Sequence, residues 1–143
     1  SIARVHPKSR ARGDMRRSIM ILSCLALSAC GPKSNFHDYT TPERAARSFI
    51  EAGRVGDTSS VRQSVVAAER ESCGNVDYKD LGEYSITLDR LIEGERAVVI
   101  MASGKLQAPL ACRMEQGEWK VSIRGTLECM QKQMEDLMAS APR

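Results

Sequence analysis

Residues 84–123, YSITLDRLIEGERAVVIMASGKLQAPLACRMEQGEWKVSI, decide the fold of this chain. Three runs alternate apolar and polar residues, the period of a half-buried strand, and one run is continuously apolar, as in a central strand. Gly94 and Gly117 mark turns between runs, and Pro109 indicates a bulge or an edge. The pattern predicts an antiparallel meander of four strands, over residues 84–89, 97–102, 106–114 and 119–123.

Two helices are predicted before the strands. Thr41 is a suitable N-cap, Pro42 suits the first helical position, and Gly56 is a suitable C-cap. Asp57 can cap a second helix, whose apolar pattern ends at residues 69–71. The inward face of this second helix would hold Val61, Val65 and Ala68.

A last helix is predicted after Gly125-Thr126. One interpretation is that its apolar face closes the domain's own core. The alternative is that this face docks another protein, because methionine side chains are flexible and adapt to varied partners. The order of two helices, four strands and one helix predicts an α+β fold. We expect a curved antiparallel sheet packed on the N-terminal helices, plus the C-terminal helix, over residues 41–143. The apolar face of the last helix consists of Leu127, Met130, Met134, Leu137 and Met138.

Three motifs in this domain resemble the nuclear transport factor 2-like superfamily, and more narrowly its bacterial lipoprotein domains of unknown function. The motifs are TPERAARSFIEA at 41–52, Gly56-Asp57, and GEWKV at 117–121. The resemblance covers residues 41–124 and implies a cone, in which a bent sheet wraps the helices around a pocket at the wide end. The helix after Ile123 departs from the usual family pattern.

The segment 15–29 is typical of a bacterial export signal. Arg16-Arg17 is followed by a short apolar run, too short for a membrane-spanning helix, and then by small residues. LSAC at 27–30 resembles the lipobox of bacterial lipoproteins. That resemblance implies cleavage before Cys30 and acyl chains on this cysteine, which would anchor the protein to a membrane. Gly31 favours the outer membrane, facing the periplasm, because an Asp at that position commonly retains lipoproteins in the inner membrane.

The leader changes the charge of the chain. The whole sequence carries a net charge of +3, but residues 1–29 hold six Lys or Arg and one Asp, which leaves 15 basic and 17 acidic residues. We interpret residues 1–14 as an upstream basic extension and residues 30–40 as a polar, lipidated tether. A slightly acidic mature domain with few aromatic residues argues against nucleic-acid binding.

Three cysteines remain after lipidation: Cys73, Cys112 and Cys129. An oxidising compartment favours one disulfide and leaves an odd cysteine, and the sequence alone does not determine the pair. Cys112 is expected on an inward strand face, where a buried free thiol is the plainer interpretation. The predicted pair is therefore Cys73–Cys129, with Cys73–Cys112 as the alternative.

Catalytic chemistry has little support in the sequence. Some superfamily members are isomerases or dehydratases with an acid or a His–Asp pair inside the cone, but here the inward strand positions are almost all apolar. The only histidines are His6, in the extension, and His37, in the tether, so no metal ligand set or cofactor is expected. We expect a lipid-anchored envelope protein whose domain binds a small apolar ligand, or alternatively another envelope protein through its last helix. The ligand pocket would be lined by Tyr84, Ile86, Leu110 and Trp119.

Overall fold

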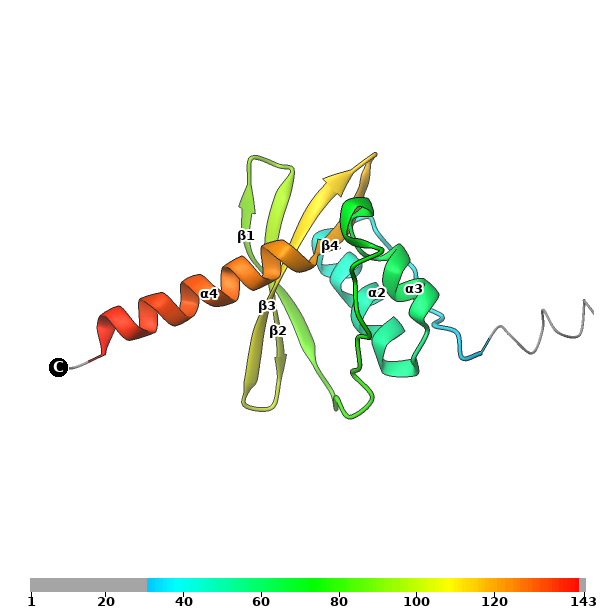
Figure 1. The fold of residues 1–143 in the computed structure, drawn as a ribbon, viewed down its shortest axis with the longest axis horizontal. Helices are drawn as coiled ribbons and strands as arrows, with labels where there is room; N and C mark the ends of the chain where they lie inside the picture. Colours follow the sequence, from blue (N-terminus) through cyan, green and yellow to red (C-terminus); the bar gives the residue numbers. More distant parts are fainter. Residues whose placement is uncertain (1–30, 142–143) are drawn as a thin grey trace, which may run out of the picture. The chain divides into compact units, whose positions relative to one another are not determined.

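The structure, a computed structural model, describes residues 31–141, so the predicted extension, export signal and lipidated Cys30 lie outside the described residues. The α+β class is confirmed, with helices on both sides of the strands in the sequence (Figure 1). The elements are α2 (Pro42–Val55), α3 (Thr58–Gln63), the 3-10 turn η2 (Ala67–Glu69), β1 (Ser85–Ile92), β2 (Arg96–Ser103), β3 (Leu106–Glu115), β4 (Glu118–Ser122) and α4 (Ile123–Ser140).

The four strands form one antiparallel sheet in the order β1-β2-β3-β4, as the meander predicted. Glu93-Gly94 and Gln116-Gly117 all have positive φ, the backbone of tight hairpin turns that match the twist of a sheet. Pro109 pairs with Ile100 of β2, but β4 pairs only with residues 111–115 of β3. Pro109 therefore lies where β3 is locally an edge, so its missing N–H leaves no partner unsatisfied.

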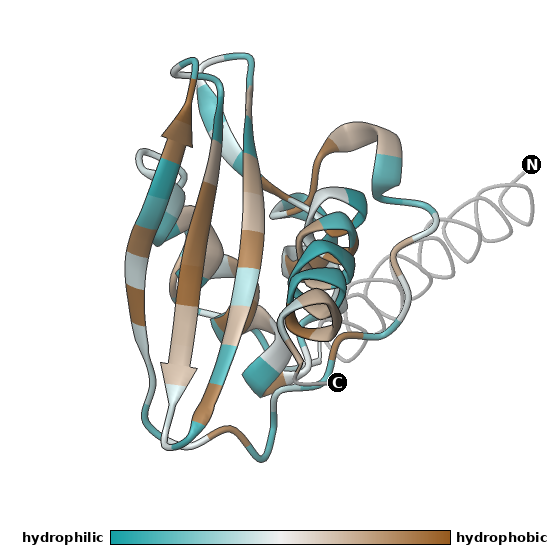
Figure 2. Cartoon of the chain, turned by 90° about the vertical axis from the view of Figure 1, so that its left-hand side faces the viewer, coloured by the Kyte–Doolittle hydropathy of each residue, from teal (hydrophilic) through white to brown (hydrophobic). Residues whose placement is uncertain are grey.

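The main core lies between α2 and one face of the sheet. Phe49 and Ile50 of α2 are buried against Val99 of β2 and Val121 of β4. Figure 2 shows the apolar centre of β2, the strand between β1 and β3, in brown. Burial of about 25 cal/mol per Å² of apolar surface makes this layer the main source of stability.

The second helix is shorter than expected. α3 ends at Gln63, and the next residues leave the helix to form an isolated bridge between Val65 and Val121. The N–H of Val66 donates to the carbonyl of Val121 at 3.0 Å. The prediction that Ala68 faces inward is therefore wrong, because this residue lies in η2 and is exposed. The extended backbone suits β-branched valines and gives β4 a second neighbour.

The segment expected as a tether packs on the domain from Ser34 onward. Ser34 is buried, and its N–H donates to the Asp57 carboxylate at 2.9 Å. Further along, Tyr39 is buried, and its carbonyl accepts from the N–H of Trp119 at 2.9 Å. Asp57 also caps α3 by accepting from the N–H and the hydroxyl of Ser60. Residues 34–40 are thus a strap held at both ends by the domain.

Candidate functional site

Helix α4 begins directly where β4 ends, earlier than expected from Gly125-Thr126. Ser122 caps it, accepting from the N–H of Gly125 at 3.0 Å. The Glu69 carboxylate accepts from the N–H of Arg124 at 2.9 Å and from the Ser122 hydroxyl at 3.0 Å. A carboxylate at a helix N-terminus also favours the helix dipole. Glu69 therefore ties η2 to the start of α4, a role that its sequence position did not predict.

The first turns of α4 pack on the sheet face opposite to α2. A Cβ added to Gly125 would lie 2.9 Å from the Cβ of Ala111, so a glycine allows the close approach. The Thr126 hydroxyl accepts from the N–H of Ala111 at 3.0 Å and donates to the carbonyl of Ser122 at 2.8 Å, so it bridges β3 and the start of α4. Ala111 and Val98 are buried on this second face. The base of α4 is thus fixed rigidly to the sheet.

The rest of α4 extends past the sheet, where Figure 1 shows it running away from the strands to the C-terminal end. No residue of α4 is buried. Its large apolar side chains are instead exposed to solvent, at fractions unusual for a face that would close a core. The exposed fractions are 60% for Leu127, 44% for Met130, 64% for Met134, 70% for Leu137 and 76% for Met138.

These five residues, here called the apolar stripe, share one side of the helix. Their spacing of three and four residues keeps them within about 100° of one another at 100° per residue. Gly125 and Cys129, which lie near the sheet, are on the opposite side of α4. The apolar stripe therefore faces away from the protein's own sheet. Charged residues occupy the other faces of the helix: Arg124, Glu128, Lys132, Glu135 and Asp136.

The four predicted pocket residues belong to the core. Leu110 and Trp119 are buried in the core, and Tyr84 and Ile86 are partly buried and pack against the same core from β1 and its N-terminal flank. The hollows described for residues 31–141 are lined by other residues. The Tyr84 hydroxyl is buried and has no hydrogen-bond partner in the described part of the chain. Burial, together with the nearby Glu51 carboxylate, raises the pKa of Tyr84 to about 12, so it stays protonated at neutral pH.

The structure does not support the predicted disulfide, because Cys73, Cys112 and Cys129 are all free. Cys73 lies beside η2 and lines a hollow with Leu127, whereas Cys129 lines a different hollow over the sheet. The two thiols thus lie on different sides of α4. Cys112 faces the core, where its thiol lies 3.7 Å from the Pro42 carbonyl oxygen. Burial raises the pKa of Cys112 to about 12, which makes it a poor nucleophile.

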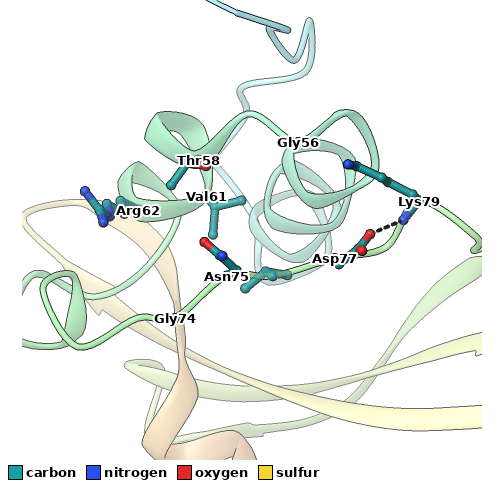
Figure 3. A pocket seen from close by; sticks show the side chains of 9 residues that line it. Gly56, Thr58, Val61, Arg62, Gly74, Asn75, Asp77 and Lys79 are labelled. Atoms are coloured by element: carbon teal, nitrogen blue, oxygen red, sulfur yellow. Dashed lines mark hydrogen bonds between the residues drawn. The ribbon is translucent and has the colours of Figure 1, made fainter.

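A small polar hollow lies between α3 and the loop of residues 74–79 (Figure 3). Arg62 and Lys79 contribute positive charge to its rim. Asp77, the only acid among its lining residues, already accepts the backbone N–H of Lys79 at 2.9 Å. This arrangement holds one end of the loop in place and provides no acid–base pair for catalysis.

Comparisons with known proteins add no assignment: no family model, curated protein or solved structure matches the chain. Among residues 31–141, no group of three metal-binding side chains comes together. Within the same residues, no helix has the length and apolar character needed to cross a membrane. The apolar stripe of α4 is therefore the feature of the described structure that most needs a functional explanation.

Proposed function

We propose that this chain is a lipid-anchored accessory protein of the bacterial envelope, whose α4 is a docking helix for another protein surface. The observation that carries the proposal is the apolar stripe, exposed along a helix whose base is fixed to the sheet. Contiguous exposed apolar surface on a soluble domain marks an interaction site. An amphipathic helix that presents such a face can insert it into a groove or pair it with another helix.

The anchor part of the proposal rests on the sequence of the leader. Basic residues, a short apolar run and LSAC at 27–30 support acylation of Cys30. The strap then leaves only residues 31–33 between Cys30 and the buried Ser34. At about 3.5 Å per residue, such a link holds the domain within about 15 Å of the lipid attachment. Mass spectrometry of the mature N-terminus tests this part: an unmodified Cys30 would exclude the anchor.

The apolar-ligand alternative is less favoured, because the residues expected to line its pocket fill the core instead. Among residues 31–141, the two groups with strongly raised pKa values, Tyr84 and Cys112, are held in their neutral forms and offer no support for catalysis. A docking function needs neither a pocket nor a titrating group. It needs an exposed face that stays in one position, which α4 supplies.

The docking function is tested by the size of the native complex. The full chain is expressed in bacteria, chemically cross-linked in intact membranes, extracted in mild detergent and run on native gels. Met134→Glu and Leu137→Glu place a charge in the apolar stripe, while Ala139→Glu places one on the opposite, exposed side. We expect the wild-type chain and Ala139→Glu to run in a complex, and the stripe variants to run as the free chain. The same mobility for all four proteins would refute a docking role for the apolar stripe.

A further inference from the structure

The apolar stripe has the spacing of a coiled-coil seam. Starting from Ile123, the apolar positions follow at intervals of four, three, four and three residues. This alternation repeats every 3.5 residues on average, which keeps a narrow apolar seam facing one partner helix. A groove would instead accept a wider, less regular face. The exposed seam positions are Leu127, Met130, Met134 and Leu137, and Ile123 at the base of the seam is partly buried against the core.

The seam is complementary to itself when one helix is reversed. If two copies of α4 run antiparallel with their two-fold axis near Lys132, Leu127 lies opposite Leu137 of the second copy. In the same register, Met130 lies opposite Met134 of the second copy. Each of these facing pairs joins side chains of equal size. Each occurs twice because of the two-fold symmetry, so the reversed pair contains four such layers. A closed two-fold pair is the commonest symmetry of homo-oligomers.

The charges of α4 do not oppose a reversed second copy. Four of its charged side chains lie on the faces of the helix away from the seam: Glu128, Lys132, Glu135 and Asp136. Antiparallel pairing sets the two helix dipoles in opposite directions, which is favourable. The positions that flank the seam bring no like charges together, because all but Arg124 are neutral. These neutral positions are Thr126, Gln131, Gln133, Met138 and Ser140.

The base of the seam leaves room for the end of a second helix. A hollow lies beside the first turns of α4, between this helix and η2. Its lining includes Ile123 and Leu127 of the seam together with Glu69 and Cys73. In the reversed pair, the C-terminal turn of the second copy reaches this hollow. The seam of each copy could then stay covered to its base.

We propose that the occupant of the apolar stripe is a second copy of this chain, paired antiparallel through α4. This inference rests on the docking function proposed above and names its partner. The helix has 18 residues and is about 27 Å long. A pair of this length buries less than the roughly 800 Å² per partner of a standard interface. We therefore expect weak pairing in dilute solution and efficient pairing where anchoring concentrates the chain on a membrane.

Cysteine cross-linking in the membranes of expressing cells tests the pairing and its direction. Two differently tagged full chains, Met130→Cys and Met134→Cys, are co-expressed in a Cys129→Ser background, because Cys73 and Cys112 are buried. After mild oxidation, we expect a disulfide-linked dimer carrying both tags. Met134→Cys expressed alone, and Ala139→Cys as a control, should stay as single chains.

Three results would overturn the inference, and only the last of them would also refute the docking function. A dimer of Met134→Cys with itself, without the mixed dimer, would mean parallel pairing and refute the reversed register. If no dimer forms while the stripe-dependent complex on native gels persists, the partner is a different protein; the second copy is then excluded and the docking function stands. If both the dimer and the complex are absent, both proposals fail.

Discussion

The strap of residues 34–40 depends on one buried carboxylate, and Asp57→Ala should destabilise the domain strongly. The Asp57 side chain accepts from the Ser34 N–H at 2.9 Å, the Ser60 N–H at 3.1 Å and the Ser60 hydroxyl at 2.5 Å. Loss of an N-cap costs about 1 kcal/mol. Each of the other two buried donors left without an acceptor costs about 1 kcal/mol more. We expect the free energy of unfolding to fall by about 3 kcal/mol.

Urea unfolding followed by circular dichroism measures this loss. For a domain of this size, about 3 kcal/mol corresponds to a midpoint lower by about 2 M. Asp57→Asn keeps one acceptor oxygen and should lose about half as much. Asp77→Ala is the matched control, because Asp77 is exposed and accepts only the local N–H of Lys79. Equal midpoints for Asp57→Ala and Asp77→Ala would refute the strap as a stabilising element.

The same carboxylate predicts a pH dependence. Burial raises the pKa of Asp57, but the hydrogen bonds from the Ser60 hydroxyl and from the backbone N–H groups of Ser34 and Ser60 outweigh it and lower the pKa below its usual value. A pKa that is lower in the folded state stabilises the fold above the unfolded value of about 4, and the stabilisation disappears as the pH falls further. Wild-type stability should therefore decrease more steeply below pH 4 than that of Asp57→Asn. Parallel curves of stability against pH for the wild type and Asp57→Asn would contradict the lowered pKa of Asp57.

Three further experiments test other features of the fold. Glu69→Ala removes two hydrogen bonds at the start of α4, so the free energy of unfolding measured in urea should fall by about 1.5 kcal/mol. Glu71→Ala is the control, because its side chain is exposed and the free energy of unfolding should change by less than about 0.5 kcal/mol. Gly53→Ala places a Cβ 2.7 Å from the Tyr78 ring, so the midpoint should fall by the equivalent of about 1–3 kcal/mol; a rise would show that the ring moves freely. Among the cysteines of residues 31–141, Cys129 should react first with a maleimide, as seen by peptide mapping, and a disulfide at Cys129 would contradict the structure.

The strands were predictable because their signals are local. The alternation over residues 84–89 and 106–114, and the glycines of the tight turns, specify a meander without reference to distant contacts. The end of α3 was not predictable in this way. Val65 fits the helical pattern, but it forms a bridge with Val121, and the gain from that long-range bridge outweighs the local preference.

The candidate site was only half predictable. The sequence places five apolar residues on one side of α4, but a face that closes a core and a face that docks a partner have the same pattern. Only the direction of the helix distinguishes them, and that direction is set by contacts far apart in the sequence. Glu69 holds the N-terminus of α4, and Gly125 allows it to lie close to Ala111. The fixed strap was missed for the same reason, because the polar composition of residues 31–40 gives no sign of the Asp57 contact.

The docking role of α4 is tested most directly by measuring whether the apolar stripe is covered in the cell. Met134→Cys and Ala139→Cys, each in the Cys129→Ser background, are labelled with a maleimide in intact membranes and again as dilute purified protein. If α4 is a docking helix, position 134 reacts several-fold more slowly in membranes than in dilute solution, while position 139, on the other side of the same helix, reacts at the same rate in both. Equal rates in both settings at position 134 would show that the apolar stripe stays exposed and would contradict a docking role for α4.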